Sequence, residues 1–299
     1  MPDLTGGTLN NRYHVVTMLG RGGMADVYKA WDQQRSVYLA IKLLREDLAE
    51  DRVFLRRFKR EAHTLSRLQH PHIVRFYGLE QEGPLAFILM DYVEGTSLRR
   101  EIFEAGKPLT PERVQEVMRP VCAALHYAHA QGFVHCDVKP GNVLIDQNNH
   151  IHISVFGIAR MSESATATMV GIGSPAYMAP EQVHGEDPTP RTDIYALGVV
   201  LHEMLTGGER PFTGERARTT GSTSEKVRYE HLHLAPPSPK RFNPELQPEL
   251  EAVVLKCLEK EPNARFANVI DLLNSLEKTI FGAVKERRAY LQKRSLQWL

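Results

Sequence analysis

The feature that most constrains the fold is a change of pattern near residue 95. Before it, five segments are rich in β-branched and aromatic residues and are separated by Gly, Asp and Gln turns: "YHVVTMLG", "ADVYKAWD", "VYLAIKLL", "IVRFYGLE" and "LAFILMDYV". After it come longer runs with apolar residues at helical spacing. The sequence therefore predicts an α+β chain with a small β-rich lobe followed by a larger helical lobe.

One predicted helix interrupts the strands, and several follow them. "DRVFLRRFKREAHTLSRLQ" has helical spacing between the third and fourth strands. Farther on, Thr110 is the expected N-cap of a helix that begins at Pro111 and stops at Gly132. "TDIYALGVVLHEMLTGG", "PELEAVVLKCLEK" and "FANVIDLLNSLEKTIFG" are further predicted helices. The polar segment 157–181 is too long for a simple connector and is expected to be functional or mobile.

The composition argues against nucleic-acid binding, a disulfide framework and a membrane span. The 299 residues carry 37 basic and 36 acidic side chains, a net charge of +1, so nucleic acid is not expected as a partner. The three cysteines form no C-x-x-C pair, which favours a reducing cytoplasm over a disulfide framework. No apolar run reaches the roughly 18 residues of a membrane span. The basic end "VKERRAYLQKRSLQWL" is expected to be a solvated helix or tail, with a membrane or partner contact as the alternative.

Two features in the β-rich part indicate a site for phosphate. In "LGRGGMADV", Gly20 and Gly22 would let backbone N–H groups approach a polyphosphate, although such a pair also occurs in ordinary tight hairpins. Lys42 lies in the apolar strand "LAIKLL", where an ammonium group needs an anionic partner. Glu61 is the candidate partner, and a lysine whose charge reaches solvent at the strand edge is the alternative.

The segment "HCDVKPGNVLI", residues 135–145, is more specific. It combines Asp137, Lys139 and Asn142 just before an apolar, strand-like run. Together with the glycine loop, the strand lysine and the later "APE", in this order, it resembles a bacterial serine/threonine protein kinase. The resemblance covers residues 13–278, nearly the whole chain.

The resemblance implies a protein-kinase fold. An antiparallel small-lobe sheet with one helix would occupy residues 13–90, a hinge 91–95, and a mainly α-helical lobe 96–278, with nucleotide between the lobes. Residues 1–12 would be an N-terminal extension, and residues 279–299 a basic C-terminal helix or tail.

It also implies roles for individual residues. Asp137 matches the catalytic base, Lys139 the cation that neutralises the transferring phosphoryl group, and Asn142 a magnesium ligand. Lys42, paired with Glu61, would hold the α- and β-phosphates of ATP. The remaining positions expected around the nucleotide are Leu19, Gly20, Gly22, Gly23, Val27, Ala40, Met90, Asp91, Val93 and Leu144.

Other matches are structural or regulatory. Glu181 is expected to pair with Arg265, and Asp193 to anchor the catalytic-loop backbone. The buried regulatory stack of the family corresponds to Leu65, His135 and Phe156. Thr166 and Thr168 match autophosphorylated positions, and Ser174 a substrate-contacting one; a polar loop without regulatory function is the alternative. Cys136 replaces the arginine that usually pairs with a phosphorylated loop, so such a switch is expected to be weak.

The largest departure from the family pattern is Val155 in "SVFG". The family places an aspartate here, which binds the magnesium that bridges the β- and γ-phosphates. An isopropyl group cannot bind a hard cation, and at about 1.4 kcal/mol per tenfold in rate the expected loss is on the order of 10³ or more. Asp26 and Glu163 are the carboxylates that could substitute, against the strict ligand geometry of Mg²⁺.

Two functions therefore remain in view. The chain is an ATP-dependent serine/threonine kinase by family, severely impaired by Val155, which acts on a protein substrate and is compatible with dimerisation for autophosphorylation in trans. The alternative is a pseudokinase that binds nucleotide and acts on a signalling partner. The intact Lys42, Glu61, Asp137 and Asn142 favour a recent or deliberate loss of the aspartate, with a natural pseudokinase substitution or a cloning variant as the other origins.

Overall fold

The computed structural model describes residues 3–21, 25–44, 50, 66–154 and 175–280. These residues form two compact units. The first contains the chain up to Ser97 together with 135–137 and the segment from Asn142 to Ser154, and the second contains 98–134, 138–141 and the chain from Pro175 onward. The segment around Asp137 is thus divided between the two units.

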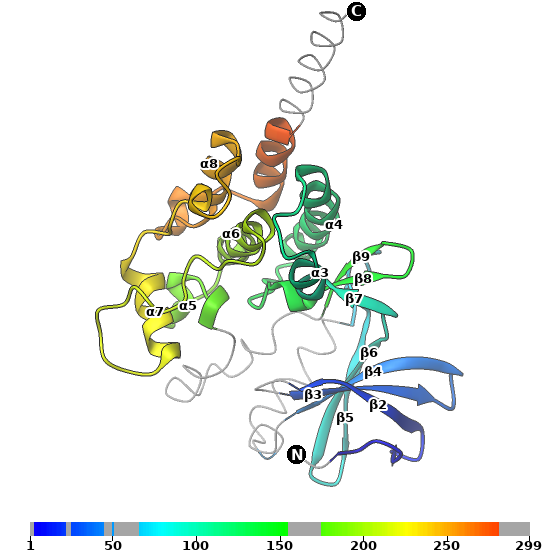
Figure 1. Ribbon diagram of the computed structural model, residues 1–299. Helices are drawn as coiled ribbons and strands as arrows, with labels where there is room; N and C mark the ends of the chain where they lie inside the picture. The colour runs from blue at the N-terminus through cyan, green and yellow to red at the C-terminus, as the bar shows by residue number, and fades with distance from the viewer. Residues whose placement is uncertain (1–2, 22–24, 45–49, 51–65, 155–174, 281–299) are drawn as a thin grey trace, which may run out of the picture. The chain divides into compact units, whose positions relative to one another are not determined.

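A six-stranded sheet forms most of the first unit (Figure 1). Its strand order is β1-β2-β3-β4-β6-β5, and every neighbouring pair is antiparallel, as the sequence predicts. The strands are β1 (Thr8–Leu9), β2 (Tyr13–Arg21), β3 (Ala25–Asp32), β4 (Val37–Leu44), β5 (Phe76–Glu82) and β6 (Leu85–Asp91).

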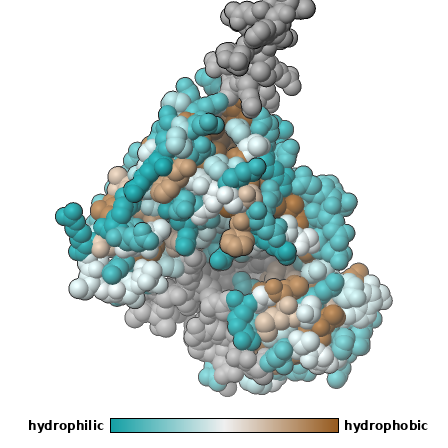
Figure 2. All heavy atoms as spheres, viewed as in Figure 1, coloured by the Kyte–Doolittle hydropathy of each residue, from teal (hydrophilic) through white to brown (hydrophobic). Residues whose placement is uncertain are grey.

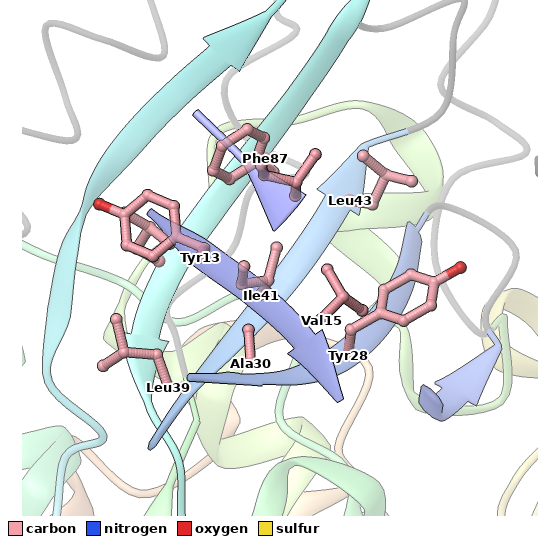
Figure 3. Close-up of a cluster of buried hydrophobic side chains, with 10 residues drawn as sticks. Tyr13, Val15, Tyr28, Ala30, Leu39, Ile41, Leu43 and Phe87 are labelled. Atoms are coloured by element: carbon pink, nitrogen blue, oxygen red, sulfur yellow. The ribbon is translucent and has the colours of Figure 1, made fainter. Parts of the chain in front are cut away.

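One face of this sheet carries a hydrophobic core (Figure 3). Tyr28, Ile41 and Phe87 are fully buried there, on β3, β4 and β6. The hydroxyl of Tyr13, on β2, donates to Glu80 Oε1 on β5 at 2.6 Å and so closes the core across the sheet. Because side chains alternate along a strand, the residues between these core positions face the opposite side. That opposite face contains the nucleotide-binding residues predicted on β3, β4 and β6.

A second, three-stranded sheet completes the first unit. It contains β7 (Gly95–Ser97), β8 (Val143–Asp146) and β9 (Ile151–Ile153), all antiparallel. The segment before β5 is joined to it, because Ile73 forms a parallel bridge with Ile153 and Val74 N donates to Ile153 O at 2.9 Å. The fourth predicted strand, "IVRFYGLE", therefore joins the large sheet only from Phe76.

The second unit is helical. Thr110 caps α4 (Pro111–Ala130) as predicted, since its hydroxyl accepts from Arg113 N at 3.2 Å and Pro111 takes the first helical position. A last helix covers residues 269–280 of the described chain. The other α-helices are α3 (Leu98–Ala105), α4 (Pro111–Ala130), α5 (Pro180–His184), α6 (Pro190–Thr206), α7 (Thr223–His233) and α8 (Pro248–Cys257).

Helix α6 lies at the centre of this unit. Every residue from Thr192 to Thr206 is buried, so the helix has no solvent-facing stripe over that length. Gly198 allows α8 to approach closely, because a Cβ at this position would lie 2.6 Å from Cys257 Cβ. The polar residues of α6 are therefore buried and need partners inside the unit.

Hydrophobic side chains on the surface are scattered. On the face in Figure 2, hydrophilic residues predominate over the described parts and hydrophobic ones appear as separate patches. The most exposed large apolar side chain among the described residues is Phe103 on α3, at 84%. None of the helices within the described ranges has the length and apolarity of a membrane span.

Candidate active site

The strand register brings the predicted nucleotide residues of β3, β4 and β6 onto one face. Val27 is the cross-strand partner of Lys42, and Ala40 is the partner of Met90. Their neighbours Tyr28, Ile41 and Leu89 point into the core on the other face. Val27, Ala40 and Met90 thus form an apolar patch on the face opposite the core, with Lys42 beside Val27, which suits a flat base and its attached phosphates.

The start of the glycine-rich loop is described, and its centre is not. Gly20 pairs with Val27 across the β2–β3 ladder, and Leu19 beside it is 45% exposed. Gly22 and Gly23 lie outside the described residues, as does Glu61, the expected partner of Lys42.

Asp26 faces away from the residues that are expected to bind nucleotide. It alternates with Val27 along β3, is 2% exposed, and lies 3.4 Å from Arg21 Nε through its Oδ2. Its Oδ1 is buried and has no hydrogen-bond partner among the described residues. A carboxylate on this side of the strand points away from Val27 and Lys42, the residues expected to face the nucleotide.

Asp137 and Asn142 are in direct contact. The side-chain amide of Asn142 donates to the backbone carbonyl of Asp137 at 2.7 Å and to its Oδ2 at 2.8 Å. Both residues are half-buried. The amide nitrogen is occupied by these two bonds, so the Oδ1 of Asn142 is the atom that can accept a cation or a hydrogen bond. The carboxylate of Asp137 is thereby held in one orientation.

His135 joins this pair to the chain before Val155. The backbone N–H of Asp137 donates to His135 Nδ1 at 3.2 Å, so the ring proton is on Nε2, which donates to Ser154 O at 3.0 Å. Ser154 N in turn donates to Asn142 O at 2.8 Å. Position 155 therefore follows a residue that is held by both His135 and Asn142, although Val155 and Phe156 themselves lie outside the described residues.

Cys136 adopts a left-handed backbone conformation, with φ of 63°. Few residues other than glycine, asparagine and aspartate take this conformation readily. Cys136 lies between the fully buried His135 and the half-exposed Asp137. Lys139 is half-buried in the part of the loop that belongs to the helical unit.

The expected hinge is held by backbone and side-chain bonds. Asp91 N donates to Arg75 O at 2.9 Å, and the hydroxyl of Tyr77 donates to Asp91 Oδ1 at 2.6 Å. Val93 is half-buried. Leu144 lies on β8 between the buried Val143 and Ile145, and so faces the other side of the small sheet.

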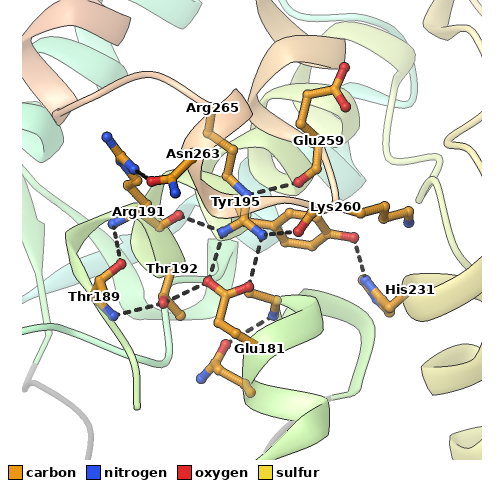
Figure 4. A network of polar contacts seen from close by, with 12 residues as sticks. Glu181, Thr189, Arg191, Thr192, Tyr195, His231, Glu259, Lys260, Asn263 and Arg265 are labelled. Carbon is orange, nitrogen blue, oxygen red and sulfur yellow. Dashed lines mark hydrogen bonds and ion pairs between the residues drawn. The ribbon is translucent and has the colours of Figure 1, made fainter. Parts of the chain in front are cut away.

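The predicted pair of Glu181 and Arg265 is present (Figure 4). The guanidinium donates to both carboxylate oxygens at 2.7 and 2.8 Å, and Thr192 donates to Glu181 Oε1 at 2.8 Å. Burial alone would raise the pKa of Glu181, but the hydrogen bonds and charge of Arg265 override it, so that this pKa is lowered. Thr166, Thr168 and Ser174 lie outside the described residues.

Two polar pairs near these elements were missed by sequence reasoning. Asp193, expected to anchor the catalytic loop, has His129 of α4 as a partner, with Nε2 and Oδ2 2.7 Å apart. Glu203 of α6 accepts from the hydroxyl of Tyr177 at 2.7 Å, and its burial raises its pKa to about 7. The signal for Glu203 was available, because it is a lone carboxylate in the apolar run "YALGVVLHEML".

The donors present do not make a full magnesium site. Within the described ranges, no cluster of three or more His, Cys, Asp or Glu side chains is suited to a metal ion. Asn142 offers one amide oxygen, and position 155 offers an isopropyl group. Mg²⁺ requires several oxygen ligands in near-octahedral geometry, so these residues do not fit the ion well.

A model of the protein kinase domain matches residues 13–275. The chain belongs to the protein kinase family. This kinase chain is 40% identical over 294 residues to the serine/threonine-protein kinase PrkC of Bacillus subtilis, an alignment that covers 97% of this chain and 44% of PrkC. It is also 40% identical over 272 residues to PknB of Mycolicibacterium smegmatis, covering 88% of this chain and 42% of PknB. The chain thus spans less than half the length of these relatives.

The solved structures agree on the fold. The kinase domain of PknI from Mycobacterium tuberculosis superposes with a TM-score of 0.73 and 28% identity, covering 92% of this chain and 99% of that domain. The expected kinase fold, with an antiparallel sheet and a mainly helical second part, is therefore confirmed, as is membership of the bacterial serine/threonine kinases.

Proposed function

We propose that this chain binds an adenine nucleotide on the open face of β3, β4 and β6 and transfers phosphate only at a severely reduced rate. Protein kinases as a family transfer the γ-phosphoryl group of ATP, with Mg²⁺, to protein hydroxyls. The observation that carries the proposal is the combination of an intact Asp137–Asn142 pair with a valine at position 155.

The residues that remain can perform part of the chemistry. Asn142 fixes Oδ2 of Asp137 at 2.8 Å, so the carboxylate is oriented to accept the proton of a serine or threonine hydroxyl. Lys42, at the phosphate end of the apolar patch, would hold the α- and β-phosphates with Glu61. Val27, Ala40 and Met90 would enclose the base, whose edge would meet the backbone of Asp91 and Val93.

The missing function is charge compensation at the transferring phosphoryl group. With Val155 in place of an aspartate, the metal ligand set loses its carboxylate, and Asp26 is buried on the wrong face of β3 to replace it. The expected loss in rate is on the order of 10³ or more. Regulation by phosphorylation of Thr166 and Thr168 belongs to the same proposal as a weak switch, because Cys136 offers no charge to a phosphate.

The second candidate is a pseudokinase that binds nucleotide and acts on a signalling partner. The retention of the nucleotide residues together with the loss of the metal carboxylate favours it. In that case, nucleotide binding would control a protein interaction rather than phosphate transfer.

One experiment separates the two. Transfer of γ-³²P from ATP to the chain itself and to a generic protein substrate is measured with Mg²⁺ or Mn²⁺, for the chain as it stands and for Val155→Asp. Activity gained only by the aspartate variant supports an inactivated kinase. If neither form transfers phosphate while ATP still raises the melting temperature of both, the pseudokinase is supported. Rapid transfer by the valine form contradicts the argument about the metal.

A further inference from the structure

Lys29 lies between two aromatic rings beside the expected hinge. Its Nζ is 4.1 Å from the ring centroid of Tyr38 and 4.3 Å from that of Tyr92. Both distances are well inside the roughly 6 Å range of cation–π attraction. The two rings meet each other edge to face, with centroids 6.4 Å apart. One ammonium group thus links β3, the start of β4 and the residue after β6.

The strand register explains how these three side chains meet. Lys29 is the cross-strand partner of Ala40, and Ala40 is the partner of Met90. Tyr38 and Tyr92 each lie two residues from one of these positions, so alternation places them on the same face. Trp31 extends the group, since it pairs with Tyr38 and their ring centroids are 4.9 Å apart.

This face is the one that carries the proposed nucleotide site. Val27 and Lys42 form the next cross-strand pair on the same side. Lys29 is two residues from Val27 along β3, a displacement of about 6.6 Å toward the hinge end of the strand. The two lysines therefore lie at opposite ends of the proposed nucleotide site. Lys42 lies at the phosphate end, and Lys29 lies at the hinge end.

The hinge backbone is held on both sides of Tyr92. Before it, Asp91 is fixed by Arg75 O and by the hydroxyl of Tyr77. After it, Glu94 O accepts from Gln147 N at 3.1 Å. Tyr92 itself is held through its ring, by Lys29 and Tyr38.

We propose that Lys29 is a positioning residue for the adenine base: by holding the ring of Tyr92, it fixes the hinge backbone that meets the adenine edge. The inference rests on the proposed nucleotide-binding function and adds a residue to it. Lys29 acts through Tyr92 and does not touch the phosphates. Removing the ammonium takes away one of the two contacts that hold the Tyr92 ring, and nucleotide binding must then restrict the hinge more than before.

The test compares two ligands on the whole chain. ATP needs both the hinge and Lys42, whereas inorganic tripolyphosphate has no base and needs Lys42 alone. Dissociation constants for both are measured by calorimetry for the unchanged chain, Lys29→Met, Lys29→Arg and the control Lys256→Met. The control removes a similar cation–π contact, because Lys256 Nζ lies 4.4 Å from the ring centroid of Phe266 in the helical unit.

We expect Lys29→Met to weaken ATP binding about five- to tenfold, the size expected for a lost cation–π clamp, and to leave tripolyphosphate binding unchanged. Lys29→Arg retains a cation over the rings and should bind ATP within about twofold of the unchanged chain. Lys256→Met should match the unchanged chain with both ligands. In a Val155→Asp background, Lys29→Met should raise KM for ATP while kcat stays the same.

Three outcomes overturn the proposal. If Lys29→Met and the unchanged chain bind ATP with equal affinity, Lys29 has no positioning role, while the proposed nucleotide site is unaffected by the result. Equal weakening of ATP and tripolyphosphate assigns Lys29 to the phosphates instead of the hinge. If the unchanged chain binds tripolyphosphate and ATP equally well, the base makes no contribution, and the proposed nucleotide function fails with the inference.

Discussion

The side-chain amide of Asn142 donates to both the backbone carbonyl and the carboxylate of Asp137, at 2.7 and 2.8 Å. These two bonds close the loop between the residues expected to be the catalytic base and a metal ligand. The same loop holds Ser154, whose backbone N–H donates to Asn142 O at 2.8 Å. The contacts among Asp137, Asn142 and Ser154 are thus present in a chain that carries valine at position 155.

Removal of the Asn142 amide should cost activity even where the metal carboxylate is restored. In a Val155→Asp background, Asn142→Ala frees the Asp137 carboxylate from its fixed orientation, and we expect kcat to fall about 10²-fold or more. Steady-state assays of phosphate transfer measure this fall in kcat. Asn148→Ala, in the exposed β8–β9 turn, is the matched control and should retain the activity of the background. Equal losses in the two variants would contradict the assigned role.

The variant Asn142→Asp tests the same contact in another way. It keeps the shape of the side chain but replaces the amide that donates to Asp137 by a carboxylate that repels it. In the Val155→Asp background, kcat should fall as it does in Asn142→Ala, because the Asp137 carboxylate again loses its fixed orientation. Steady-state phosphate transfer checks this expectation, and an unchanged kcat would contradict the orienting role of the amide.

Glu203 should make the protein less stable as pH rises. Its pKa is raised to about 7 by burial, compared with an ordinary value of 4.5, so the folded protein holds a proton that the unfolded chain releases between these values. That contribution to stability is fully present below pH 4.5 and is lost as pH rises through 7. At about 1.4 kcal/mol per pKa unit, the loss is on the order of 3 kcal/mol.

Glu203→Gln removes the titration but keeps an acceptor for the hydroxyl of Tyr177. Urea unfolding at pH 5 and pH 7.5 measures the effect. The variant should gain stability relative to the parent as pH rises, whereas Glu225→Gln, an exposed carboxylate with a lowered pKa, should not. Parallel pH dependences of Glu203→Gln and the parent would contradict the assignment.

The fold and the Asp137 loop were predictable because their signals are local. Thr110 followed by Pro111 predicts the start of a helix, and Asp137 and Asn142 lie five residues apart in one loop. In contrast, His129 and Asp193 are 64 residues apart, and Tyr177 and Glu203 are 26 apart. These pairs form only when helices pack, and no spacing in the sequence encodes such packing.

Other differences have equally physical causes. Strands β7 and β9 have three residues each, too few to display an alternating pattern. Ile73 and Val74 have the composition of a strand in the large sheet, yet they bond to β9 instead. The face that carries Lys29, Tyr38 and Tyr92 depends on strand register, which becomes visible only once the sheet is built.

Gly198 should resist substitution by alanine. In the interior of a helix this change usually stabilises by about 1 kcal/mol. Here the added Cβ would lie 2.6 Å from Cys257 Cβ and 3.1 Å from Leu258 Cδ2, so α6 and α8 must separate. Overpacking of this kind costs about 1–3 kcal/mol, and thermal unfolding of Gly198→Ala should therefore show a lower Tm. Gly141→Ala is the control, because its added Cβ would have no atom of the described residues within 4 Å.

Glu181 and Arg265 should be coupled in their effects on the free energy of unfolding, because each neutralises the buried charge of the other. Arg265→Met leaves a carboxylate that is 4% exposed without its cation, and we expect a loss of about 3–5 kcal/mol in the free energy of unfolding. Adding Glu181→Leu removes the stranded charge and should recover most of that loss, because an apolar pair can replace a buried ion pair. Urea denaturation of the parent, both single variants and the double variant forms a complete cycle. Additive losses in that cycle would mean that the two side chains do not stabilise the helical unit through each other.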